Sequence, residues 1–117
     1  MQTLIIGDTW EFEYLITDKQ GQALDLTSFA IRASILDSAS TLLKIGSKEV
    51  SGGSDEQITG TSDGKLNLEF PAGKTSTTKQ GSAQLEVEIT SGEGKRYTIV
   101  QDSYLIAKGI ITWQNAV

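Results

Sequence analysis

The chain has 117 residues, of which 38% are hydrophobic, so it is long enough for one domain with a buried core and too short for two. It contains no cysteine and no histidine, which excludes a disulfide-stapled scaffold, a thiol nucleophile, a histidine base and nearly all structural zinc sites. A net charge of −5 disfavours generic binding to nucleic acid and to anionic membranes, because both are negatively charged.

We expect one domain over residues 1–117, without a targeting or membrane segment. The first residues carry no basic stretch followed by a long apolar run, so no conventional signal peptide is expected. Apolar runs such as residues 4–6 and 110–111 are far too short to cross a bilayer.

The first half of the chain has a hydrophobic period of two, which predicts strands with one buried face. Residues 8–17 give the clearest strand, with apolar side chains on one face opposite Glu11 and Glu13: Trp10, Phe12, Tyr14 and Ile16. Residues 18–21 form a predicted turn, and alternation returns over residues 29–35. Leu43 and Ile45 indicate a shorter strand, and residues 51–54 a loop.

The second half continues this pattern. Residues 61–65 contain Asp-Gly and predict a hairpin turn, followed by a strand that ends at Pro71. Residues 72–81 are polar and predict a crossover loop with one helical turn. The remaining elements are a strand over residues 83–89, a turn at 91–94, a strand beginning at Tyr97 and a last strand over 104–113, with Gly109 as a bulge.

These elements predict an all-β domain of about seven to nine short strands. No window of eleven or more residues has the 3.6-residue period of a helix, and turn signals recur every 8 to 12 residues. This spacing is typical of a β-sandwich or a partly open barrel.

Two short motifs imitate catalytic or nucleotide-binding loops. Residues 60–64 match Gly-x-Ser-x-Gly, but a nucleophile elbow at Ser62 would need a strand-to-helix turn and a histidine base, so a hairpin turn is favoured. Residues 73–75 are Gly-Lys-Thr, yet position 68, where a phosphate-binding loop has glycine, is leucine. We therefore expect neither activity.

Carboxylates on strands suggest two further kinds of site. Glu11 with Glu13, or Glu86 with Glu88, could act as a carboxylate pair of the kind used in glycoside hydrolysis. They lie opposite apolar rows, however, so solvated strand faces are expected. Calcium ligands are conceivable in the turns, but their spacing does not match a calcium loop, so no metal or cofactor is predicted. The residues concerned are Asp18, Asp25, Asp55 and Asp63.

Aromatic residues offer a third kind of site, a ligand-binding or protein-binding surface. Trp10, Phe12 and Tyr14 could form an aromatic platform, but alternation with charged residues favours the core. Trp113, near the end of the sequence, is the candidate interface residue, and a place in the core is the alternative for it. Arg32 and Arg96 are the only arginines, too few for a nucleic-acid groove.

The order of these segments resembles the small immunoglobulin-like β-sandwich domains of tailed bacteriophages. The resemblance rests on Gly-Asp-Thr at 7–9, Leu-Asp-Leu-Thr at 24–27, the late strand at 85–89 and Gly-Ile-Ile-Thr at 109–112. Such domains include the N-terminal domain of upper-baseplate-type proteins and stand-alone tail or neck proteins. The chain departs from them at Ala83, where they often have an aromatic residue.

The resemblance implies a function in assembly. It implies an immunoglobulin-like antiparallel β-sandwich in the virion, made in the host cytoplasm and placed in the tail, baseplate, neck or capsid decoration. The expected partners are other virion proteins and further copies of the chain, with no catalytic residue to carry over. Two alternatives remain open, a carbohydrate- or receptor-binding module and a small carboxylate-dependent enzyme.

Overall fold

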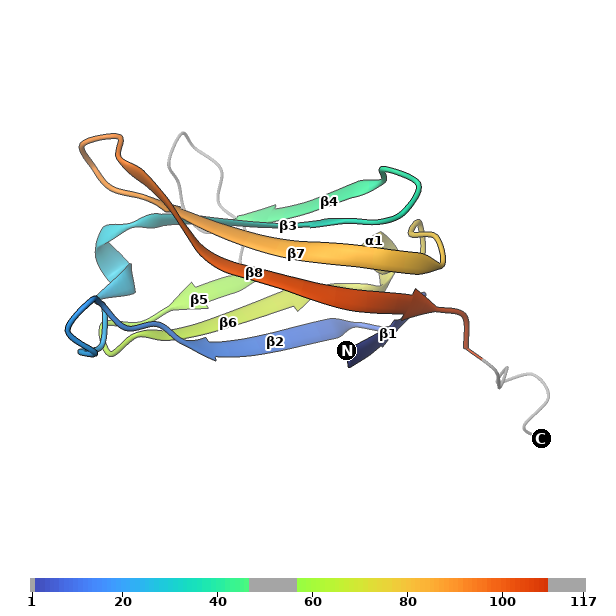
Figure 1. The fold of residues 1–117 in the computed structure, drawn as a ribbon, viewed down its shortest axis with the longest axis horizontal. Helices are drawn as coiled ribbons and strands as arrows, with labels where there is room; N and C mark the ends of the chain where they lie inside the picture. Colours follow the sequence, from blue (N-terminus) through green and yellow to red (C-terminus); the bar gives the residue numbers. More distant parts are fainter. Residues whose placement is uncertain (1, 47–56, 110–117) are drawn as a thin grey trace.

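The computed structural model describes residues 2–46 and 57–109, which form a sandwich of a five-stranded and a three-stranded sheet (Figure 1). The strand orders are β1-β8-β7-β3-β4 and β2-β6-β5. The elements are β1 (Gln2–Ile5), β2 (Trp10–Leu15), η1 (Leu26–Ser28), β3 (Ala30–Leu36), β4 (Leu42–Gly46), β5 (Ile58–Gly60), β6 (Lys65–Phe70), α1 (Ala72–Thr75), β7 (Gly81–Thr90) and β8 (Arg96–Ala107). The immunoglobulin-like β-sandwich predicted from the sequence is confirmed, and the described residues hold eight strands.

The core lies between the two sheets and follows the period-two pattern of the sequence. Every second residue of the inner strands is buried, which places the apolar rows of both sheets face to face. Phe12 of β2 contacts Phe70 of its own sheet edge-on, with ring centroids 6.0 Å apart, and Tyr104 of the other sheet at 5.2 Å. These ring contacts connect the two layers.

One pairing departs from the predicted antiparallel pattern. β1 runs parallel to β8, from Gln2 opposite Tyr104 to Ile5 opposite Ala107. The chain then crosses to the other sheet through residues 6–9 and begins β2, which pairs antiparallel with β6. The other strand pairs in both sheets are antiparallel over the described residues.

The prediction of two strands, one beginning at Tyr97 and one over residues 104–113, is wrong in the described region. β8 is one strand from Arg96 to Ala107, because the polar residues between Val100 and Tyr104 fit its alternation. The bulge is at Ile99, which the β7–β8 register skips, and Gly109 lies beyond the strand. Residues 51–54 and 110–113 lie outside the described residues.

The predicted turns and the crossover are confirmed. Thr61 N donates to the Lys65 carbonyl, and Gly64 has a φ of +83° in that hairpin turn. Ser91 N donates to the Lys95 carbonyl in the β7–β8 turn. The expected helical turn is α1, which follows Pro71.

Asp37 is a buried carboxylate that joins the β3–β4 turn to the loop before β7. Its Oδ1 accepts from the backbone N–H of Ala39 (2.9 Å) and Thr41 (2.8 Å), and its Oδ2 from that of Lys79 (2.8 Å). Burial acts to raise the pKa of Asp37, but the hydrogen bonds from Lys79, Thr41 and Ala39 outweigh burial and hold it below its usual value. The charged form is therefore the one that stabilises the fold.

We expect Asp37→Asn to lower the free energy of unfolding by about 1.5–3 kcal/mol at pH 7, because buried N–H groups lose a charged acceptor. The folded-state pKa lies below the unfolded value of about 3.9, so the contribution is complete above that value and disappears as the pH falls through the folded pKa. Urea unfolding between pH 7 and pH 2 should show this difference shrinking. Asp18→Asn, in an exposed turn, is the control and should change stability by less than about 0.5 kcal/mol. Equal effects of the two variants would contradict this role for Asp37.

Candidate functional site

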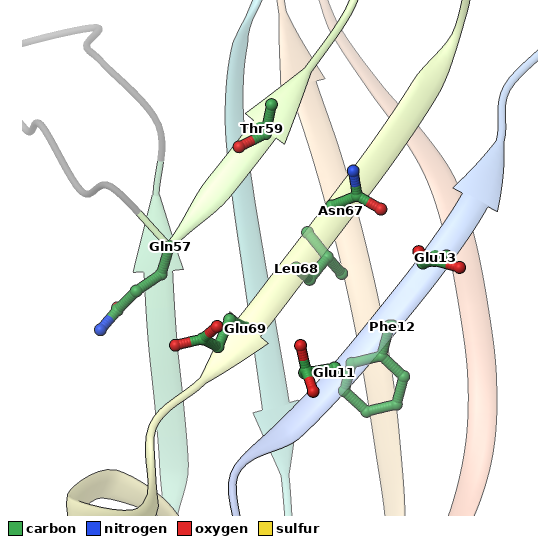
Figure 2. A pocket seen from close by; sticks show the side chains of 8 residues that line it. All are labelled: Glu11, Phe12, Glu13, Gln57, Thr59, Asn67, Leu68 and Glu69. Carbon is green, nitrogen blue, oxygen red and sulfur yellow. The ribbon is translucent and has the colours of Figure 1, made fainter.

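The outer face of the three-stranded sheet carries a polar hollow of about 440 Å³ (Figure 2). Three glutamates lie on it, on the strands that Figure 2 draws side by side. Phe12 and Leu68, whose side chains belong to the core, complete the lining. The full lining is Glu11, Phe12, Glu13, Gln57, Thr59, Asn67, Leu68 and Glu69.

Strand register places the polar residues of this hollow in two rows. Glu11 is directly opposite Glu69, and Glu69 N donates to the Gln57 carbonyl on the far side. In the next row Asn67 lies between Glu13 and Thr59. Because β2 and β6 bury alternate residues, the same alternation that fills the core turns these side chains outward.

The opposition of Glu11 and Glu69 is electrostatically unfavourable within the chain. Like charges directly opposite each other on a sheet are destabilising. Lys65 lies on the same face but beyond Asn67, where it is opposite the exposed Leu15. The face therefore presents ionised acceptors, which suit a positively charged hydrogen-bond donor from outside the chain.

The glutamates of the five-stranded sheet are arranged differently. Glu88 of β7 is directly opposite Arg32 of β3, which is an opposite-charge pair. Glu86 accepts a hydrogen bond from Gln101 Nε2 at 3.1 Å. Both sequence-predicted pairs thus lie on outer strand faces, but they are far from equivalent, because only Glu11 has a like charge opposite.

The aspartates considered as calcium ligands organise turns. Asp18 accepts from the backbone N–H of Gln20 and Gln22. Asp25 caps η1, and hydrogen bonds from the Thr27 side chain and backbone hold its pKa below the usual value. The Thr61 hydroxyl donates to Asp63 and likewise lowers the pKa of that carboxyl.

Asp55, the fourth aspartate considered, lies outside the described residues. Within residues 2–46 and 57–109, no three or more acidic side chains are grouped so that they could hold a metal ion. In the same part of the chain, no helix is long and apolar enough to cross a membrane.

Both motif imitations have structural explanations. Ser62 lies in the hairpin turn between β5 and β6, as the sequence favoured. Thr75 of the Gly-Lys-Thr segment is buried, and its hydroxyl donates to the Asp8 carbonyl at 2.6 Å. Lys74 Nζ donates to the Lys44 carbonyl at 2.9 Å. These two hydrogen bonds attach α1 to β4 and to the link between β1 and β2.

The row of aromatic residues on β2 is core, as alternation favoured. Trp10 and Phe12 are buried, and Trp10 Nε1 donates to the Ile5 carbonyl at 2.8 Å. An aromatic platform at these two residues is therefore ruled out. Trp113, the candidate interface residue, lies outside the described residues.

Tyr14, the third aromatic residue of that row, forms a polar link between the sheets that the sequence analysis missed. Its hydroxyl donates to Asp102 Oδ2 at 2.8 Å and lies 3.0 Å from the Tyr104 hydroxyl. Burial, followed by the hydrogen bonds with Tyr104 and Asp102, raises the pKa of Tyr14 well above its usual value. The alternation of β8 is the sequence signal that could have indicated this link, because it places Asp102 on the same face of the strand as Tyr104.

Comparison with models of protein families finds no match, and no curated protein sequence matches the chain. Among solved structures, the chain is similar to the crystal structure of CopC from Methylosinus trichosporium OB3b, with a TM-score of 0.47 and 15% sequence identity. The match covers 96% of this chain and 88% of that chain.

We expect Tyr14→Phe to lower the free energy of unfolding by about 1–2 kcal/mol, because Asp102 and Tyr104 lose a partly buried partner. Tyr97→Phe is the matched control, since Tyr97 is 50% exposed and should tolerate the change within about 0.5 kcal/mol. Chemical unfolding at pH 7 measures both variants. Equal stability of Tyr14→Phe and the wild type would show that the link contributes nothing.

We expect Glu11→Gln to raise the free energy of unfolding by about 0.2–1 kcal/mol, because it removes the repulsion from Glu69. Glu88→Gln is the control and should lower stability by a similar amount, since it removes the partner of Arg32. Both changes should shrink in 1 M salt, which screens exposed charges. Effects of the same sign in the two variants would contradict the assignment.

Proposed function

We propose that this chain is a bacteriophage virion structural protein that acts through protein–protein contacts in the tail, baseplate, neck or capsid decoration. The observation that carries the proposal is the opposition of Glu11 and Glu69 in the hollow on β2 and β6. Surface residues that destabilise the isolated domain are expected at binding sites, where another molecule supplies the opposite charge that the domain itself lacks.

The chemistry of the hollow favours a basic partner surface. Carboxylates accept hydrogen bonds from arginine and lysine, and charge complementarity guides both encounter and orientation. Asn67 and Thr59, in the row beside the two glutamates, can add neutral hydrogen bonds. A repeated, individually weak contact of this kind suits a particle with many copies, because multivalency multiplies its effect.

The carbohydrate-binding alternative would use the same hollow without an aromatic platform at Trp10 or Phe12, since both are buried. A glycan array separates the two functions. Binding of a defined glycan that Glu11→Gln and Glu69→Gln abolish would favour the carbohydrate-binding module. Assembly with virion proteins requires no such binding.

Quantitative mass spectrometry of purified particles from the encoding phage tests the proposal directly. We expect the protein at a fixed copy number, with few copies for a neck or tail-tip position and hundreds for a capsid decoration. Absence from particles, with the protein present in infected cells, would overturn the virion function.

The same particles test the acidic face. A phage encoding Glu11→Gln with Glu69→Gln should incorporate the protein several-fold less well, although the isolated variant is at least as stable as the wild type. Glu86→Gln, on the outer face of the other sheet, is the control and should be incorporated normally. Normal incorporation of the double variant would show that this face is not the assembly contact.

A further inference from the structure

β1 is held by the sandwich more weakly than its neighbours. It is an edge strand of four residues, and within residues 2–46 and 57–109 its one partner strand is β8. The pairing is parallel, which is slightly weaker per residue than an antiparallel one. Its single fully buried side chain is Leu4, whereas Gln2 and Thr3 are exposed and Ile5 is half-buried. The ladder between β7 and β8 is complete without β1.

The edge strand on the other side of the same sheet is better anchored. β4 buries Leu43 and Ile45, and its turn to β3 is tied to the loop before β7 by Asp37. Loss of β1 would therefore disturb the five-stranded sheet less than loss of β4.

The link between β1 and β2 contains one residue that is held in place and one whose backbone can rotate. Asp8 is fixed, because its carbonyl accepts a hydrogen bond from the buried Thr75 hydroxyl at 2.6 Å. Gly7 has a φ of +90°, and among the described residues none beyond its two chain neighbours has an atom within 4 Å of the position that a Cβ would take there. Since glycine populates both signs of φ readily, rotation there moves β1 while β2 and α1 stay in place.

We propose that β1 exchanges between two copies of this chain, with Gly7 as the hinge, to give a two-fold symmetric dimer. In the exchanged form β1 of each copy pairs with β8 of the other, and Leu4 fills the same site in the partner. The hydrogen bond from Trp10 Nε1 to the Ile5 carbonyl forms between copies. The turn hydrogen bond from Asp8 N to the Ile5 carbonyl of the same chain opens with the hinge, and exchange of identical elements conserves the other contacts of β1.

This inference deepens the proposed function, on which it rests for its biological meaning, because it supplies a contact between copies in an assembly. It uses the five-stranded sheet and leaves the acidic hollow on the three-stranded sheet unchanged.

Disulfide trapping tests the exchange, and the absence of native cysteine makes the result unambiguous. Thr3→Cys and Leu105→Cys are placed in separate chains, since these residues are register partners and both are exposed. The two variants are mixed, unfolded, refolded together and oxidised, and linked peptides are identified by mass spectrometry. We expect a disulfide-linked heterodimer, because exchange brings the two positions of different chains within bonding distance.

The matched control pairs the same Leu105→Cys chain with a Ser82→Cys chain. Ser82 is the register partner of Leu105 on β7, which its ten-residue ladder and short turn keep with β8 of its own chain. The Thr3→Cys mixture should give several-fold more heterodimer than the Ser82→Cys mixture. Equal yields, or no heterodimer from Thr3→Cys, would overturn the exchange.

A second measurement uses both substitutions in one chain. Oxidation at high dilution fastens β1 to its own β8, so this form should remain monomeric at concentrations where the wild type forms dimers in size-exclusion chromatography with light scattering. A dimer that persists would show that copies meet elsewhere, and a wild type that is monomeric throughout would also overturn the exchange. Particle composition is measured independently, so exchange and virion function can fail separately.

Discussion

The packing of Phe12 between Phe70 of its own sheet and Tyr104 of the opposite sheet is the contact on which the arrangement of both layers depends. Side chains on a strand alternate between faces, so a strand whose inner residue is fixed has its outer residues fixed as well. Seating Phe12 in the core turns Glu11 and Glu13 outward. Seating Phe70 does the same for Glu69, and the β2–β6 register then brings Glu11 and Glu69 together.

Polar side chains are buried in the sandwich where they find hydrogen-bond partners. Asp37 is nine-tenths buried but accepts three backbone hydrogen bonds, so its charge replaces water with N–H dipoles. Asp102 points inward from β8 and meets the hydroxyl of Tyr14 from the other sheet. Each aspartate therefore connects two segments that are far apart in the sequence. Directional hydrogen bonds fix the relative position of such segments more specifically than apolar contacts alone.

The strands themselves could be predicted because their signal is local. Apolar and polar residues alternate within a few positions around Trp10 and Phe12 and from Leu66 to Phe70. The two hairpin turns are predicted by the dipeptides Asp-Gly and Ser-Gly. β8 is less obvious, because Gln101, Asp102 and Ser103 are three consecutive polar residues within it. The alternation of β8 indicates which way Asp102 points, but its partner Tyr14 lies 88 residues away, and no local pattern identifies that partner.

The candidate site shows the same limit. Alternation alone indicated that Glu11 and Glu13 share a strand face, which the structure confirms. Their relation to Glu69 depends on which residues of β2 and β6 are opposite, and register between strands more than fifty residues apart is set by the core rather than by either segment. The parallel pairing of β1 also depends on long-range contacts, since Gln2–Ile5 pairs with residues near the other end of the described chain.

The two proposed contacts are compatible because they use different sheets. Exchange would place the partner's β1 where the chain's own β1 pairs with β8, and the hollow on β2, β6 and β5 would stay accessible in each copy. A two-fold dimer would then present two acidic faces in a fixed relation, and a partner with repeated basic surfaces could engage both. In such an assembly, basic groups of the partner would offset the repulsion between Glu11 and Glu69 in both copies. The repulsion would thus make the isolated protein slightly less stable and the assembled protein more selective for a positively charged partner.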